Sequence, residues 1–179
     1  MSVQTELTIE DFEQLPHALA HNHELVNGEL VDVSGNSGYH NSLRDCLVEL
    51  LRPHVRTHKL GKVISEQEFD FNENAHGPDV SFFTTGKVSQ YDPTKRVQLF
   101  VPDLAIEIES ENDRLAAAMR KINRYRECGT KEVWLISPST RRALVFSEHA
   151  DRILHENDEF RSDLIPGFSI RLKDLFDRA

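Results

Sequence analysis

Several carboxylates lie on one side of a strand that the sequence predicts near its middle. Residues 103–109 alternate between apolar and polar side chains, which is the pattern of a strand with two different faces. One face carries the apolar side chains of Leu104, Ile106 and Ile108. The other carries Asp103, Ala105, Glu107 and Glu109. Because buried carboxylates are costly unless they are paired or bind a metal ion, this polar face either contacts solvent or lines a site.

A further carboxylate and a metal ion would complete a set of groups that can hydrolyse a phosphate ester. Asp79 follows Pro78 at the start of another predicted strand. Asp79 and Glu107 could share Mg²⁺ or Mn²⁺, which are hard cations that prefer oxygen ligands. Such an ion polarises a phosphodiester oxygen and lowers the pKa of a bound water molecule. A nearby lysine would stabilise the negative charge that develops in the transition state.

The lysine is displaced from its usual place in this kind of site. The common nuclease pattern is Pro-Asp, followed later by Asp or Glu, any residue and Lys, and here Glu109 occupies the lysine position. Lys121 on the helix predicted after the strand is the substitute, because a long side chain can reach back to the strand end. Tyr125 is four residues further on and neighbours Lys121 on that helix. Glu109 is then either a further metal ligand or an exposed strand residue.

Two more residues could take part, and each candidate also has an ordinary alternative. His40 could activate a water molecule or contact phosphate, or it could be a local hydrogen-bonding residue at a helix start. Glu29, just past a predicted hairpin turn, could reach the metal ion as an additional acid. Asp79 could instead satisfy backbone donors in a turn, Glu107 could face solvent and Lys121 could be an ordinary surface lysine.

Local signals place these residues in a mixed set of helices and strands. Asn27-Gly28 between two alternating runs predicts a hairpin over residues 23–33. Helices are expected over residues 8–15, 39–58 (with Pro53 causing a kink or an early end), 112–127 (with N-cap residues at 110–113) and 173–176. The third of these should bury Leu115, Ala118, Ile122 and Tyr125. Further strands are expected over residues 62–71, 79–83, 103–109, 131–137, 141–147, 151–156 and 166–172, with loops over 72–78 and 84–96.

Length and composition indicate one ordinary globular domain spanning residues 1–179, with 39% hydrophobic and 28% charged residues. No run is long enough to span a membrane, and the N-terminal residues lack the pattern of a secretory signal. Cys46 and Cys128 have neither metal-ligand spacing nor the density of a disulfide framework, so we expect buried thiols in a reducing, cytoplasmic setting.

The net charge of −9 argues against a protein that coats nucleic acid non-specifically, because phosphate contacts need Lys and Arg. A local basic rim is still compatible with this charge. It would consist of Arg114, Arg120, Lys121, Arg124, Arg126 and Lys131, which could equally form a solvated helix face.

The order of these segments resembles that of the bacterial putative restriction endonuclease family (Uma-two), a branch of the PD-(D/E)XK nuclease superfamily. The resemblance covers most of the chain. It rests on residues 24–30, His40, residues 78–80, residues 102–110, Lys121 with Tyr125, Gly129 with residues 132–135, Pro138 and residues 166–170.

This resemblance implies a restriction-endonuclease-like α+β fold, in which helices flank a mixed central sheet. It also implies that Asp79, Glu107 and the backbone carbonyl of Ile108 bind the metal ion and that Lys121 is the migrated catalytic lysine. The expected activity is Mg²⁺- or Mn²⁺-dependent cleavage of DNA, and the expected assembly is a homodimer. A hydrolase for another phosphate ester, and a non-catalytic binding or oligomerisation module that kept the fold, remain alternatives because of Glu109 and the acidic composition.

Overall fold

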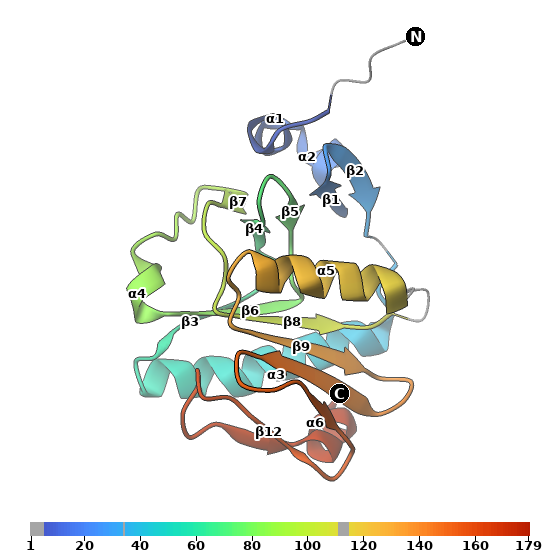
Figure 1. The fold of residues 1–179 in the computed structure, drawn as a ribbon, viewed down its shortest axis with the longest axis vertical. Helices are drawn as coiled ribbons and strands as arrows, with labels where there is room; N and C mark the ends of the chain where they lie inside the picture. Colours follow the sequence, from blue (N-terminus) through green and yellow to red (C-terminus); the bar gives the residue numbers. More distant parts are fainter. Residues whose placement is uncertain (1–5, 34, 111–114) are drawn as a thin grey trace.

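The computed structural model describes residues 6–33, 35–110 and 115–179 of the chain. The helices within these ranges are α1 (Ile9–Gln14), α2 (His17–Ala20), α3 (Gly38–Thr57), α4 (Thr85–Val88), α5 (Leu115–Glu127) and α6 (Leu172–Arg178) (Figure 1). None of these described helices combines the length and the apolar character that crossing a lipid bilayer requires.

A six-stranded mixed sheet forms the centre of the molecule. Its strands lie in the order β11 (Arg152–Leu154), β10 (Arg142–Ser147), β9 (Glu132–Ser137), β8 (Leu104–Ile108), β6 (Val80–Thr84) and β3 (Gly61–Ser65). The β8 and β9 strands are parallel and joined through α5, whereas the other neighbouring pairs are antiparallel. This mixed sheet with flanking helices confirms the predicted fold class.

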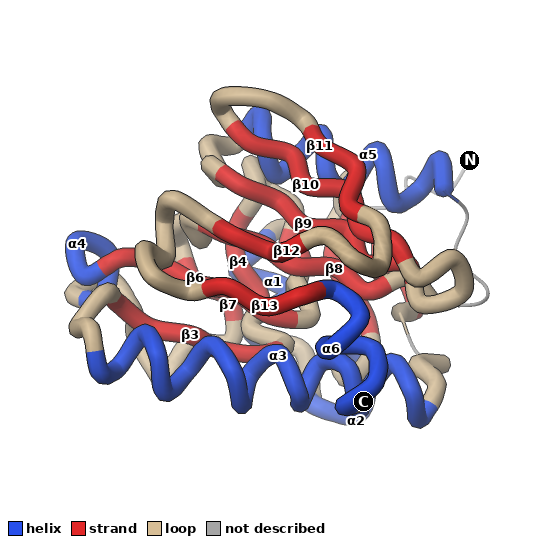
Figure 2. Tube along the Cα trace, turned by 90° about the horizontal axis from the view of Figure 1, so that it is seen from below, coloured by secondary structure: helices blue, strands red, loops and turns tan. Residues whose placement is uncertain are grey.

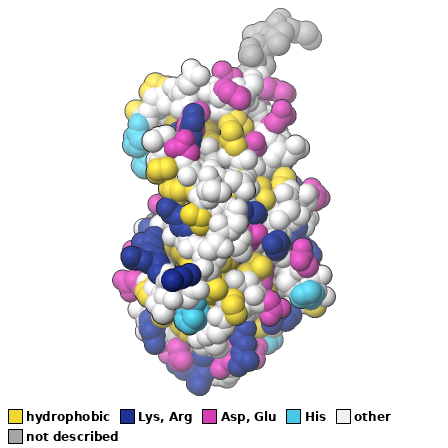
Figure 3. Space-filling view, turned by 90° about the vertical axis from the view of Figure 1, so that its left-hand side faces the viewer, with side chains coloured by type: hydrophobic (Ala, Val, Ile, Leu, Met, Phe, Trp, Pro, Cys, Tyr) yellow, Lys and Arg dark blue, Asp and Glu magenta, His cyan; other side chains and the backbone are white. Residues whose placement is uncertain are grey.

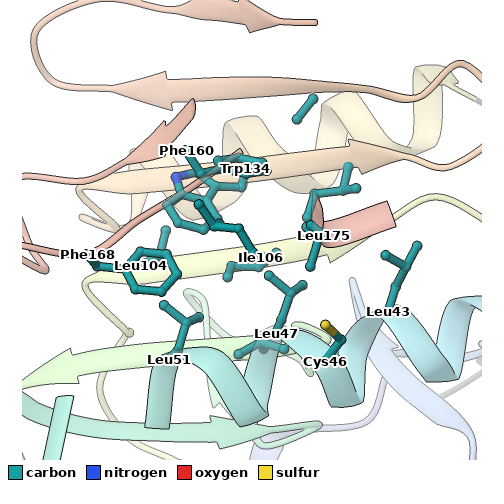
Figure 4. Packing of buried hydrophobic residues seen from close by; sticks show 14 of the residues in the cluster. Leu43, Cys46, Leu47, Leu51, Leu104, Ile106, Trp134, Phe160, Phe168 and Leu175 are labelled. Atoms are coloured by element: carbon teal, nitrogen blue, oxygen red, sulfur yellow. The ribbon is translucent and has the colours of Figure 1, made fainter. Parts of the chain in front are cut away.

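The two long helices cover opposite faces of this sheet, as the alternation in β8 requires. Ile106 packs on the same side as the buried residues of α3, whereas Ala105 packs on the side of α5 with Ile122 and Tyr125. Figure 2 shows α3 running along one side of the sheet, and Figure 4 shows its apolar side chains meeting those of β8 and β9. The expected face of Leu104, Ile106 and Ile108 is therefore buried.

A second sheet of five short strands forms a separate layer near the N-terminus. Its order is β2 (Glu29–Asp32), β1 (His23–Val26), β5 (Ala75–His76), β4 (Glu68–Asp70) and β7 (Val97–Gln98). The predicted hairpin is confirmed, because β1 and β2 pair antiparallel with Val26 opposite Glu29. A smaller apolar cluster around Phe12 and Leu25 joins this sheet to α1 and α2.

Arg96 fastens the N-terminal helices to the second sheet. Its guanidinium group donates to both carboxylate oxygens of Glu68 and to the carbonyl of Ala20, and it lies 4.0 Å from the centre of the Phe12 ring. The carboxylate of Glu13 accepts from the backbone N–H groups of Arg96 and Val97. The bonds to Glu13 pair backbone N–H groups at the start of β7. Together these contacts hold α1 and α2 against the second sheet, and these two helices and this sheet are called the N-terminal layer below.

The prediction of one continuous strand over residues 62–71 is wrong, because this segment forms two strands that belong to different sheets. The chain leaves β3 at Ser65 and enters β4 at Glu68. Glu66 between them has a φ of +52°, and its N–H donates to the carbonyl of Asp79. A left-handed residue turns the chain sharply, which alternation alone does not reveal.

Other boundaries also differ from the predictions. The early end expected at Pro53 does not occur, because α3 continues through this exposed proline to Thr57. Short elements appear in the predicted loops, namely α4 and β5, and β12 (Glu159–Arg161) pairs with β13 (Ser169–Arg171). Leu115 is 60% exposed, so it does not belong to the buried stripe of α5. The predicted N-cap of α5 at residues 110–113 falls largely outside the described residues.

The surface carries both signs of charge. On the face in Figure 3, acidic and basic side chains are interspersed, with Lys and Arg denser across the lower two thirds of the view. The net charge of −9 is thus not spread as one acidic surface on this face.

Gly61 at the start of β3 should tolerate no side chain. Its φ is +153°, and a Cβ would lie 2.0 Å from the carbonyl oxygen of Phe83 on the neighbouring strand. We expect Gly61→Ala to lower the free energy of unfolding by about 2 kcal/mol or more, because the β3–β6 pair must separate. Urea unfolding measures this change. The matched control is Gly86→Ala, whose Cβ meets no atom within 4 Å; equal stability of the two variants would contradict this account.

Candidate active site

The candidate site lies in a cavity of about 1300 Å³ between the N-terminal layer and α5. The ends of β6 and β8 form its floor, because Val80 pairs with Ile106 and so places Asp79 beside Glu107 and Ile108. Asp79, Glu107, Ile108, Lys121 and His40 all line this cavity. With Glu109, which also lines the cavity, the structure brings together six of the residues that the sequence singled out.

Asp79 is held in place by the backbone of the neighbouring strand. Its Oδ2 accepts a hydrogen bond of 2.7 Å from the N–H of Ile108 and lies 3.3 Å from Nε2 of His40. The same Nε2 donates to the carbonyl of Ile108 at 3.0 Å. The carboxylate and the carbonyl are thus fixed relative to each other by one imidazole.

His40 reaches this position from the first turn of α3, where Ser37 caps the helix by accepting from the His40 N–H. The ring is only 3% exposed, and Nδ1 has no hydrogen-bond partner among the described residues. Burial alone would lower the pKa of His40, but the hydrogen bond and charge of Asp79 raise it above its ordinary value. His40 therefore acts on the floor of the cavity through Asp79 and Ile108.

Glu107 is bound by two side chains of α5. Nζ of Lys121 lies 3.1 Å from Oε1 of Glu107, and the hydroxyl of Tyr125 donates to the same oxygen at 2.6 Å. Burial, together with the neighbouring charges of Asp79 and Glu24, raises the pKa of Glu107 to about 7 in spite of Lys121. Burial also raises the pKa of Tyr125 well above its ordinary value, so that it remains a donor.

The additional acid from an early segment is Glu24 on β1, which the sequence analysis did not select. Its Oε1 lies 2.9 Å from Nζ of Lys121, and its two oxygens also accept from His76 (2.8 Å) and from the N–H of Gly77 (3.0 Å). Burial would raise the pKa of Glu24, but Lys121 and His76 lower it to about 2. Glu24 is therefore ionised, and it and Glu107 pair with the same ammonium group.

The structure does not bring Glu29 to the site. It is exposed on β2, the edge strand of the second sheet, and it is not among the residues lining the cavity. No local sequence pattern identifies Glu24, because it and its neighbour Leu25 are both buried and so point to opposite covered faces of β1.

Glu109 and Asp103, the outer acids of the β8 face, have different environments. Glu109 is half-buried and lines the cavity, and its N–H donates to the carbonyl of Ile136. Asp103 is fully buried at the other end of the strand, where it accepts from the Thr84 N–H and lies 3.1 and 3.2 Å from Nζ of Lys87 and Lys131. Asp103 thus ties α4 and Lys131, the residue before β9, to the start of β8.

His76 links Glu24 to a second cation. Its Nδ1 lies 2.8 Å from Oε2 of Glu24, and its Nε2 lies 3.3 Å from Nη1 of Arg124. Because guanidinium can only donate, Nε2 must accept and Nδ1 must carry the proton, which defines a neutral ring. Burial, with the charges of Lys121 and Arg124, lowers the pKa of His76 in agreement with this assignment.

The donors on the cavity floor fit a hard divalent cation. Asp79 and Glu107 offer carboxylate oxygens, and the carbonyl of Ile108 keeps a second lone pair beside its bond to His40. Asp79, Glu107 and Glu24 outnumber Lys121, so added positive charge would be stabilising. In the described part of the chain, no three His, Cys, Asp or Glu side chains are arranged as a metal shell by themselves. Water would therefore have to complete the coordination.

Comparisons with known proteins agree on the fold. The Uma2 family model, described as a putative restriction endonuclease, matches residues 9–173. A solved structure, a putative nuclease belonging to DUF820 from Anabaena variabilis ATCC 29413, is similar with a TM-score of 0.83 at 20% sequence identity. This likeness covers 96% of this chain and 98% of that chain, and at this identity it shows the fold alone. No curated protein sequence matches the chain.

The raised pKa of Glu107 predicts a pH dependence of stability in the absence of divalent ions. A carboxyl group whose pKa is about 7 in the folded state and about 4.5 when unfolded stabilises the fold at low pH. This contribution is lost as the pH rises from about 4.5 through 7. The wild type therefore loses stability between pH 4.5 and 8, whereas Glu107→Gln has no titrating group at this position. The free energy of unfolding of Glu107→Gln minus that of the wild type should increase by roughly 3 kcal/mol over this range. Urea unfolding in EDTA measures it, and a difference that does not change with pH would contradict the raised pKa.

Glu24→Gln should lower the free energy of unfolding more than Glu29→Gln, the same change at the other acid of the β1–β2 hairpin. Removing one partner of a buried ion pair costs about 3 kcal/mol, whereas the same change at exposed Glu29 should cost less than about 0.5 kcal/mol. Because the pKa of Glu24 is lowered to about 2, the effect should be full above pH 4.5 and disappear as the pH falls towards 2. Thermal unfolding of Glu24→Gln and Glu29→Gln side by side checks this prediction, and equal losses would show that Glu24 is not a buried partner of Lys121.

Proposed function

The chain belongs to the Uma2 family of putative restriction endonucleases, and we propose that it is a Mg²⁺- or Mn²⁺-dependent endonuclease that hydrolyses DNA phosphodiester bonds. The observation that supports this most is the Lys121 ammonium group, which lies against Glu107 at the sheet edge where Asp79 also lies. Carboxylates from neighbouring strands together with a fixed cation are the groups that metal-assisted phosphodiester hydrolysis requires.

Each residue has a proposed role that follows from its contacts. Asp79, Glu107 and the Ile108 carbonyl would hold the metal ion, and Glu109 at the cavity edge would be a supplementary ligand. When bound, a divalent ion supplies Lewis acidity and a more acidic water molecule. His40 is a positioning residue, because it fixes Asp79 relative to the carbonyl of Ile108.

Lys121 is proposed to act by charge and not as a base. Burial would lower its pKa, but Glu107 and Glu24 raise it well above the ordinary value, so the ammonium group keeps its proton at all working pH values. A protonated lysine stabilises negative charge on a phosphate oxygen. Its place on α5, and not at position 109, leaves this function intact because Nζ reaches Glu107.

DNA as the substrate and a two-fold assembly are parts of the same proposal. The metal centre contacts only the phosphate, so the choice of DNA rests on family membership. Cutting both strands of a duplex needs two sites, and a symmetric homodimer is the commonest way to supply them.

Two variants separate metal binding from cleavage. We expect saturating Mn²⁺ to raise the melting temperature of the wild type by about 5–10 °C, which corresponds to roughly 2.7 kcal/mol at a hundredfold excess over Kd. Asp79→Asn should lose both this shift and the cleavage of plasmid DNA. Lys121→Met should keep the shift, because Lys121 is not a ligand, and should lose cleavage by roughly 10²–10³-fold.

The outcomes of this experiment are distinct. If Asp79→Asn cleaves DNA at the same rate as the wild type, the proposed metal site is excluded. A wild type that neither responds to metal ions nor cuts DNA would favour the alternative of a nuclease fold that serves as a binding module.

A further inference from the structure

One face of α5 presents two arginines to the cavity in addition to Lys121. Ala117, Ala118, Arg120, Lys121 and Arg124 line the cavity from this helix. Lys121 is already paired with Glu24 and Glu107. Arg120 and Arg124 are one helical turn apart, or about 6 Å along the axis. They form a short basic row beside the acidic floor.

Arg124 is fixed without losing its charge. Its guanidinium group donates to Oδ1 of Asn27 at 3.1 Å and to Nε2 of neutral His76 at 3.3 Å. Among the described residues neither a carboxylate nor any other anion pairs with it. An arginine that is oriented by neutral acceptors keeps its remaining donors and its full charge for an external anion.

Asn27, one of the two residues that orient Arg124, is itself held in place by hydrogen bonds. Asn27 occupies the hairpin turn between β1 and β2 with a φ of +50°, and its N–H donates to Oδ1 of Asn74 at 2.8 Å. Asn74 is buried and its amide group also donates to the carbonyls of Phe71 and Asn72. The turn is thus tied to the second sheet, and Arg124 is held between this turn and α5.

Arg120 differs from Arg124 in having no partner that orients it. It is exposed and makes no hydrogen bond or ion pair within the described residues. An unpaired arginine at a cavity wall, next to one that is oriented by neutral groups, is suited to a chain of phosphates. The described residues that line the cavity include no Phe, Tyr or Trp, which are the large rings on which unpaired bases stack best, and the aromatic side chains there are histidines, of which His17 and His21 stack on each other. This composition favours the backbone of duplex DNA.

We propose that Arg120 and Arg124 bind phosphates that neighbour the scissile phosphate on the same strand of duplex DNA. This inference rests on the proposed nuclease function, and it places the bound strand alongside α5. The floor of the cavity receives the reacting phosphate, and the two arginines receive the adjoining ones. They are binding residues, so their loss weakens DNA binding without removing the catalytic groups.

The test measures how DNA binding depends on salt. Fluorescence anisotropy with a labelled duplex, in Ca²⁺ to limit cleavage, gives log Kobs against log [KCl]. We expect Arg120→Gln and Arg124→Gln each to reduce the steepness of this line by about 0.9, and the double variant by about 1.8. The matched control is Arg126→Gln on the same helix, whose guanidinium group pairs with Asp151 and lies over the Phe146 ring. It should leave the slope unchanged.

Each result supports or overturns the proposal. Because exposed Arg120 makes no hydrogen bond or ion pair with the described residues, Arg120→Gln should keep the melting temperature of the wild type, and it remains informative even if Arg124→Gln unfolds. Unchanged slopes in both variants, or no binding to duplex DNA at any salt concentration, would overturn the phosphate site. Tighter binding to single strands than to duplex would overturn the assignment to duplex DNA. Changed slopes without any metal-dependent cleavage would retain this site and reject the nuclease proposal.

Discussion

The ammonium group of Lys121 is the interaction on which the site depends. It lies between Glu24 from the second sheet and Glu107 from the central sheet, so it joins the two layers through one buried charge. Without it, Asp79, Glu107 and Glu24 would be neighbouring buried anions with no compensating cation, which is an arrangement that protein interiors avoid. The position of α5 over β8 and the position of the N-terminal layer are therefore both constrained by the same atom.

Local patterns were enough to identify the groups on the central sheet. The alternation in residues 103–109 separates Ile106 from Glu107 without knowledge of the partners, and the helix after β8 had to return across the sheet and bring Lys121 with it. These predictions succeed because a parallel pair joined by a helix allows few arrangements. The restriction-endonuclease-like fold class was implied by the family resemblance, and the similar solved structure agrees with it.

Glu24 could not be identified in this way, because its role depends on how two separate sheets meet. Glu24 and Glu29 stand in the same hairpin with similar local sequence, and only the contact of β1 with β5 decides which one is buried. The division of residues 62–71 into β3 and β4 depends likewise on one left-handed residue, Glu66. Local propensity carries little information about contacts between distant segments, and both errors arise there.

The order of the site residues along the chain has a consequence for biosynthesis. Glu24, Asp79 and Glu107 emerge from the ribosome before Lys121, since synthesis proceeds from the N-terminus and domains complete their folding as units. A nascent chain that ends before α5 has the acidic groups but no ammonium group to hold the two sheets together. The complete cavity can therefore form only when α5 and β9 have been synthesised, because residues of both line it. The proposed nuclease function would then be absent from any chain that stops before Lys121.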